Sequence, residues 1–88
     1  MKAATTLQFR NAVRTIACAN AVDVSGTTWT EKRPGTVTRY VGFPMWGTAW
    51  ALREQMAVAV ERLLCAQGVT AKARISKGGY LRGVCIAA

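Results

Sequence analysis

Hydrophobic and polar positions alternate with helical spacing in two stretches of the chain and with strand spacing in four others. The longest helical pattern covers residues 46–67, which are rich in strong helix formers. Thr48 is placed to cap its start, and Gly68 stands where a left-handed residue ends a helix. At 100° per residue, one broad apolar face contains Ala49, Leu52, Met56, Ala59, Val60, Leu63 and Ala66. Glu54 and Glu61 fall roughly opposite this face, so we expect them to be solvated surface charges.

A first helix is predicted from Thr5 to about Asn20. Thr5 and Gln8 have the spacing of a capping box, in which each side chain bonds the other residue's backbone N–H. The residues expected to face the core are Phe9, Val13, Ile16 and Ala17. Arg10 and Arg14 are neighbours on the helix surface, and they are either solvated charges or a two-pronged phosphate contact.

The segments with strand spacing form two predicted β-hairpins. The first joins residues 22–30 to residues 36–43 through Pro34-Gly35, a pair that suits a type II turn. The second joins residues 69–76 to residues 80–87 through a two-residue type I′ turn at Gly78-Gly79. That turn would place Ile75 opposite Arg82. Val84 and Ile86 would then lie on the apolar face, and Leu81, Gly83 and Cys85 on the face of Lys72 and Arg74.

The order helix, hairpin, helix, hairpin predicts a single α+β domain over residues 1–88. We expect an αββαββ arrangement, with one four-stranded antiparallel sheet and both helices on one face. The other sheet face would be partly open, which leads us to expect a homodimer.

Charge narrows the range of partners. Twelve Lys and Arg residues stand against four Asp and Glu residues, a net charge of +8. Such a balance favours an anionic partner, which could be nucleic acid, a nucleoprotein or an acidic protein surface. Three cysteines without a CxxC pair favour a reducing cytoplasm over a secreted disulfide framework. Arg10 and Arg14 interrupt any secretory signal, and the charges of the central helix exclude a membrane span.

Catalytic chemistry finds little support in the sequence. The chain has no histidine, and it has neither a phosphate-binding loop nor a nucleophile motif. The cysteine spacing fits no zinc module. We therefore expect a protein that is not an enzyme and that uses no metal or cofactor.

The strongest binding signal is the last third of the chain, where residues 62–88 hold five basic residues and no acid. A basic hairpin with an aromatic residue can follow a phosphate backbone or stack on a base. The candidate contacts in the two hairpins are Lys72, Arg74, Lys77, Tyr80, Arg82, Lys32, Arg33 and Arg39. Alternatively, these side chains protect exposed strand edges against aggregation.

Trp46 and Trp50 lie one helical turn apart, beside Pro44. They either close the small core or anchor a protein partner. In the second case the protein would be an inhibitor or adaptor that docks on an acidic protein surface. Short basic domains without motifs are common among phage and mobile-element accessory proteins, including inhibitors of bacterial defence such as anti-CRISPR proteins. This association rests on size and composition, and no motif assigns the chain to a family.

Overall fold

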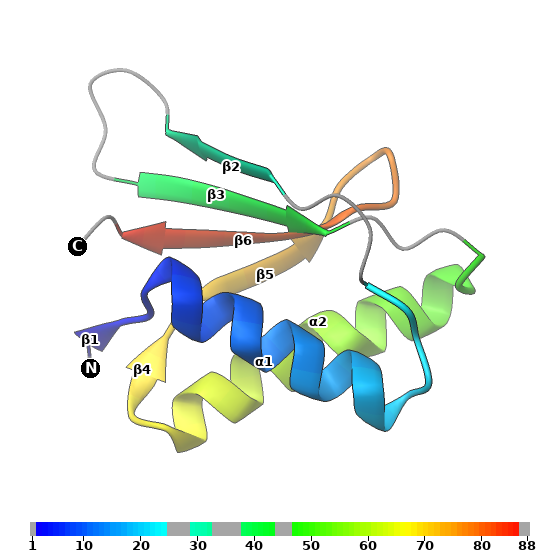
Figure 1. Cartoon of the computed structure of the whole chain (residues 1–88), viewed down its shortest axis with the longest axis horizontal. Helices are drawn as coiled ribbons and strands as arrows, with labels where there is room; N and C mark the ends of the chain where they lie inside the picture. The colour runs from blue at the N-terminus through cyan, green and yellow to red at the C-terminus, as the bar shows by residue number, and fades with distance from the viewer. Residues whose placement is uncertain (1, 25–28, 33–37, 44–46, 87–88) are drawn as a thin grey trace.

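The computed structural model describes residues 2–24, 29–32, 38–43 and 47–86, with the backbone alone in the strand segments 29–32, 38–42 and 82–86. The α+β class is confirmed by two helices and several short strands (Figure 1). The elements in chain order are β1 (Lys2–Ala3), α1 (Thr6–Ala19), β2 (Trp29–Lys32), β3 (Thr38–Phe43), α2 (Trp50–Ala66), β4 (Val69–Thr70), β5 (Lys72–Ile75) and β6 (Leu81–Ile86).

Helix α1 begins as predicted. The Gln8 backbone N–H donates to Thr5 Oγ1 at 3.1 Å, and the Thr5 N–H donates to Gln8 Oε1 at 2.9 Å. This capping box satisfies donors that a helix start would otherwise leave free. The buried residues of the helix are Phe9, Ala12, Val13 and Ala17, and Ile16 is partly buried. The predicted core face of α1 is therefore confirmed.

Helix α2 differs from its prediction at its start and in the face it buries. It begins at Trp50, and no side chain caps its start. The predicted Thr48 cap is therefore wrong, whereas Gly68 adopts the predicted left-handed conformation, with φ +82°. The buried residues are Met56, Ala57, Val60 and Leu64, so Met56 and Val60 of the predicted face are confirmed and Ala57 and Leu64 were missed. Leu52 and Leu63, also of the predicted face, are partly buried against the core. Apolar residues occur around most of this helix, so their spacing alone could not establish which side meets the sheet.

The described strands form two sheets. The larger has the order β2-β3-β6-β5, and every neighbouring pair in it is antiparallel. The smaller pairs β1 with β4 in parallel and aligns Lys2 with Val69. One antiparallel sheet is therefore not the whole β structure, and the predicted strand 69–76 is interrupted at Ala71. The parallel pair was missed because two-residue strands carry no periodic signal.

The first predicted hairpin is shorter than expected. Strand β2 begins at Trp29, and residues 22–24 form no strand. Val24 is nevertheless buried, with 8% of its surface exposed. The Pro34-Gly35 turn lies outside the described residues.

The second hairpin has a three-residue loop in place of the predicted two-residue turn. The Ser76 N–H donates to the Tyr80 carbonyl at 2.9 Å, and the Gly79 N–H donates to the Ser76 carbonyl at 2.9 Å. Gly79 takes a positive φ of 86°, as the last residue of such a loop requires. Ile75 therefore pairs with Leu81 rather than with Arg82.

This shift of one residue exchanges the two faces of β6. Leu81, predicted to lie on the face of Lys72 and Arg74, is fully buried in the core. The pairing predicted for Val84 is also wrong, because the register aligns its backbone with Lys72. The side chains of Val84 and Ile86 lie outside the described part of the structure.

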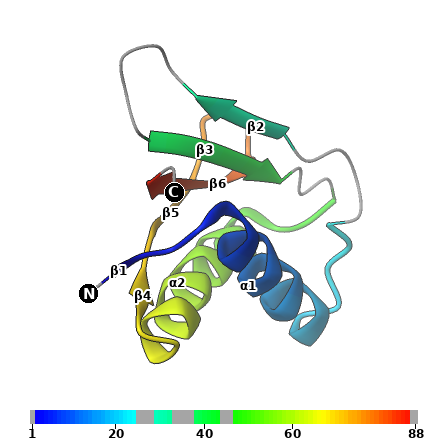
Figure 2. The same ribbon diagram turned by 60° about the vertical axis from the view of Figure 1, so that its left-hand side comes forward.

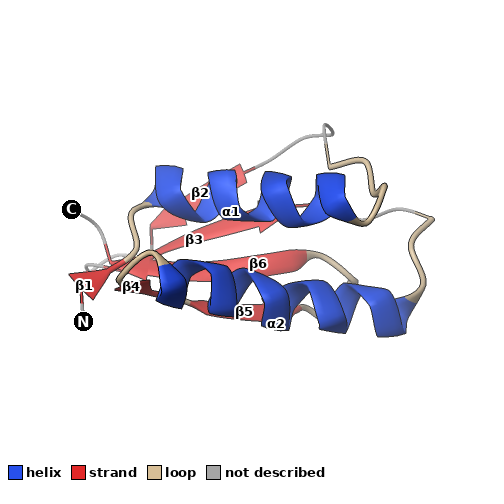
Figure 3. Cartoon of the chain, turned by 90° about the horizontal axis from the view of Figure 1, so that it is seen from below, coloured by secondary structure: helices blue, strands red, loops and turns tan. Residues whose placement is uncertain are grey.

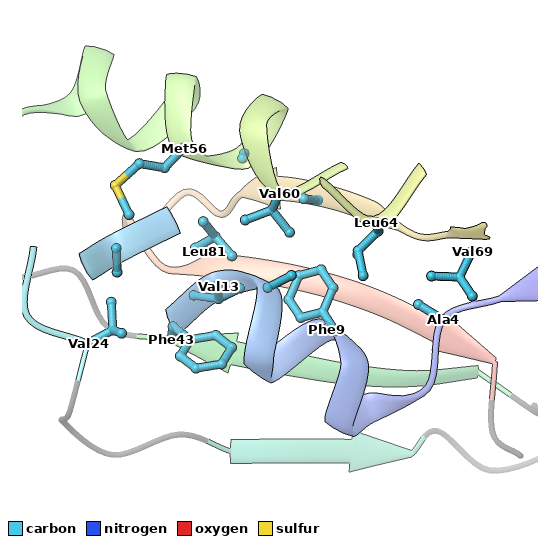
Figure 4. Packing of buried hydrophobic residues seen from close by; sticks show 14 residues of the cluster. Ala4, Phe9, Val13, Val24, Phe43, Met56, Val60, Leu64, Val69 and Leu81 are labelled. Carbon is cyan, nitrogen blue, oxygen red and sulfur yellow. The ribbon is translucent and has the colours of Figure 1, made fainter. Parts of the chain in front are cut away.

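Both helices lie against the same face of the larger sheet (Figures 2 and 3). Between them and the sheet is a core in which the Phe9 and Phe43 rings meet, with centroids 6.4 Å apart (Figure 4). The chain leaves β5 through residues 76–80, and this turn reaches the start of α2.

Candidate nucleic-acid interface

Arg53 joins the start of α2 to the turn of the β5–β6 hairpin. Its Nη1 donates to the Gly79 carbonyl at 3.0 Å, and its Nε donates to the Thr48 carbonyl at 2.8 Å. The guanidinium also lies over the Trp50 ring, with its carbon 5.5 Å from the ring centroid. Two segments that are distant in the sequence are thereby held side by side.

Trp50 is consequently fixed beside the hairpin turn while remaining 47% exposed. Its indole Nε1 donates to Glu54 Oε1 at 3.0 Å, which orients the ring. Lys77 is exposed in the turn, and Tyr80, which follows the turn, is half-buried. A Cβ at Gly78 would come within 3.1 Å of the Tyr80 ring, so this ring lies directly against the turn. We call Trp50, Arg53, Lys77 and Tyr80 the hairpin-tip cluster.

A second group of contacts covers the middle of β5. Glu61 Oε1 accepts the Ala73 backbone N–H at 2.7 Å. Arg74 Nη1 donates to the Ala73 carbonyl at 3.0 Å and lies 3.3 Å from Glu61 Oε1. We call these contacts among Glu61, Ala73 and Arg74 the edge clamp.

The edge clamp gives the charged side chains of Glu61 and Arg74 a structural role. β5 is an outer strand of the larger sheet, so no described strand pairs with its outward backbone groups. The prediction that Glu61 is only a solvated charge is wrong, because its carboxylate caps one of these groups. For Arg74 the contacts support edge protection, although its side chain is 72% exposed.

The remaining predicted site residues are distributed over both hairpins. Lys72 is exposed on β5. The register places Arg74 opposite Arg82, and Lys32 opposite Arg39. The side chains of Lys32, Arg39 and Arg82 lie outside the described part of the structure. Arg33 and Trp46 lie outside it entirely.

The structure thus unites residues that the sequence placed in separate candidate sites. Trp50, considered as a protein anchor, lies beside Lys77 and Tyr80 of the basic hairpin. Arg53 was missed. Arg53 lies three residues after Trp50 on the helix, and this spacing could have predicted the contact of its guanidinium with the Trp50 ring. Nothing in the sequence indicated the bond to Gly79.

Within the described segments, no group of three or more His, Cys, Asp and Glu side chains could hold a metal ion. No helix in the same segments has the length and apolarity needed to cross a membrane. No known protein family, curated protein or solved structure matches this chain. Its function must therefore be inferred from its own residues.

Proposed function

We propose that this protein is a non-enzymatic cytoplasmic module that binds nucleic acid, alone or within a nucleoprotein, through its β5–β6 hairpin. The observation that supports this best is the half-exposed Trp50 ring, which is held beside a turn that carries the exposed Lys77. The chain's net charge of +8 supplies a general attraction for a polyanion.

The hairpin-tip cluster combines two features used to bind single strands. An exposed indole ring offers a stacking surface to any unpaired base, and each such stack contributes about 1–3 kcal/mol. Lys77 lies in the same turn and can contact a phosphate next to a stacked base, and Lys72, farther along the hairpin, can contact another phosphate of the strand. A base within a duplex is already stacked on its neighbours, so we expect single strands to bind more tightly than duplexes.

The first test is a titration of labelled single- and double-stranded DNA and RNA at about 50 and 200 mM salt. Single strands should bind, and their affinity should fall as salt increases. Trp50→Ala should weaken binding roughly tenfold, and Trp50→Phe should retain most of it because a phenyl ring still stacks. The absence of binding to every probe at low salt would refute the proposal.

A matched pair of double variants locates the site. Lys72→Ala with Lys77→Ala removes two exposed charges from the hairpin, and Arg14→Ala with Arg62→Ala removes two exposed charges from the helices. The hairpin pair should cause the larger loss of affinity. Circular dichroism should show that both variants remain folded, because exposed substitutions usually change stability little. Equal losses would indicate diffuse attraction without a defined site.

The second candidate function is docking on an acidic protein surface, as an inhibitor or adaptor of the anti-CRISPR type. The observation that favours it is the exposure of two apolar side chains on α2, Trp50 at 47% and Val58 at 49%. Exposed aromatic residues often provide much of the binding energy at protein interfaces. A pull-down with and without nuclease separates the two functions, since only a direct protein partner persists after nuclease treatment.

A further inference from the structure

The outer edge of β5 carries backbone hydrogen-bonding groups that no strand among the described residues pairs with. The Ala73 N–H points away from β6, because it bonds to Glu61 of α2. In an antiparallel pair, alternate residues direct both backbone groups to the same side. Ile75 therefore also directs its N–H and carbonyl outward, and no bond from a described residue occupies them.

A groove lies beside this edge, between β5 and α2. Its volume is about 290 Å³. The α2 side contributes Trp50, Glu54, Ala57 and Val58, and the β5 side contributes Ala73, Arg74 and Ile75. Helix α2 lies beneath β5 (Figure 2) and overlaps it when the sheet is seen from the helix side (Figure 3), so its outer flank lies near the edge of the sheet. A further strand next to β5 would cover the exposed Val58 and Trp50.

We propose that the β5 edge binds an extended acidic peptide as an additional strand of the sheet. The peptide backbone would bond to Ile75, and one of its apolar side chains would enter the groove beside Val58. Strand addition of this kind obtains affinity from main-chain bonds and specificity from pockets for alternate side chains. This proposal does not depend on nucleic-acid binding.

The charges along β5 favour an acidic occupant over a second copy of this chain. Lys72 and Arg74 are exposed on the strand, and Lys77 follows it in the turn. An acidic peptide would place carboxylates opposite these cations. The register already places Arg74 opposite Arg82. Pairing β5 with the β5 of a second copy would add further Lys and Arg residues on the other side of Arg74, and like charges in opposite positions destabilise a sheet.

The edge clamp regulates access to this edge. Glu61 occupies the Ala73 N–H, so a peptide that pairs beyond Ile75 must displace the Glu61 carboxylate. Displacement also frees Arg74 to pair with an acidic residue of the peptide. Glu61→Ala should therefore tighten peptide binding several-fold. It removes the carboxylate that competes with the peptide for the Ala73 N–H, and it removes a negative charge that repels the acidic peptide.

The probe is a fluorescein-labelled, end-capped peptide of alternating Asp and Val, titrated with the full chain and followed by anisotropy. Two control peptides separate the contributions to binding. One carries N-methyl groups on alternate backbone nitrogens and cannot add as a strand, and the other has Lys in place of Asp. We expect the Asp–Val peptide to bind and both controls to bind at least tenfold more weakly.

Two protein variants locate the binding edge. Val58→Gln makes the groove polar, and Leu7→Gln makes the same kind of change at a 63% exposed position on α1. Val58→Gln should weaken binding roughly tenfold, which corresponds to the loss of one buried apolar side chain. Leu7→Gln should leave binding unchanged.

Several results would overturn the proposal. They are no binding of the Asp–Val peptide, equal binding of the N-methylated peptide, and equal effects of the two protein variants. Self-association of the chain that Val58→Gln abolishes, measured by sedimentation without peptide, would assign the edge to a second copy instead.

Discussion

At the scale of single residues, Arg53 shows how one planar side chain can join two distant segments of a small protein. It bonds to the Thr48 and Gly79 carbonyls and lies over Trp50. A lysine keeps the positive charge but cannot reproduce this fork of donors.

Arg53→Lys should therefore lower the free energy of unfolding by about 1 kcal/mol, the usual net contribution of a hydrogen bond. Urea unfolding measures this loss. Arg62→Lys at an exposed position of the same helix is the control and should have no measurable effect. An Arg53→Lys variant as stable as the parent would show that the bonds to Thr48 and Gly79 contribute nothing.

Leu81 tests the register of the second hairpin. Its side chain is fully buried, so Leu81→Ala should cost about 2–5 kcal/mol through lost burial and the cavity left behind. The control is Val58→Ala, which shortens an apolar side chain that is 49% exposed and should cost far less. In the two-residue turn predicted from the sequence, Leu81 would point to solvent, and its replacement would then have as little effect as the control.

At the scale of elements, the contact between α2 and the hairpin loop depends on Gly79. Its φ of +86° is a conformation that other residues rarely adopt, and a Cβ there would overlap the Arg53 guanidinium. Gly68 has a similar φ of +82°, but no atom lies within 4 Å of its added Cβ. Comparing alanine substitutions at the two glycines therefore separates the effect of backbone strain from that of a steric clash.

Both Gly79→Ala and Gly68→Ala should lower the melting temperature, and Gly79→Ala should lower it more. In terms of free energy we expect about 1 kcal/mol for Gly68→Ala and a further loss for Gly79→Ala from displaced Arg53 bonds. Repeating Gly79→Ala in an Arg53→Ala background tests this origin, because the further loss should then disappear. Equal effects of the two glycine variants in the parent protein would contradict a tight Arg53 contact.

At the scale of the whole molecule, the net charge of +8 should make binding to nucleic acid strongly dependent on salt. Each phosphate contact on a single strand contributes about 0.7 to the slope of log affinity against log salt. Replacing both Lys72 and Lys77 by alanine should therefore lower this slope by about 1.4. A weaker affinity with an unchanged slope would mean that these lysines do not contact phosphates.

The oligomeric state is a second property of the whole molecule. A homodimer remains a prediction, and it concerns the face of the larger sheet opposite the helices (Figure 2). Light scattering at high micromolar concentration should show twice the chain mass. A monomer mass under those conditions would contradict the prediction.

The sequence alone was sufficient to predict the features that depend on neighbours within one or two turns. The Thr5 and Gln8 capping box, the core face of α1 and the left-handed Gly68 are encoded in spacings of a few residues. The α+β class followed from the same local periods, and so did the position of a basic hairpin near the end of the chain. Local patterns determine these features because both partners of each contact are close together in the sequence.

The tertiary structure decided the features that need partners far along the chain. The bond from Arg53 to Gly79 spans 26 residues, and the bond from Ala73 to Glu61 spans 12. The face of α2 that is buried, and the register that buries Leu81, were settled by competition for one core, because apolar residues were available on more than one side. The place of Trp50 in the hairpin-tip cluster also depends on tertiary packing, because only the packing of α2 beneath the sheet brings the first turn of α2 to the hairpin.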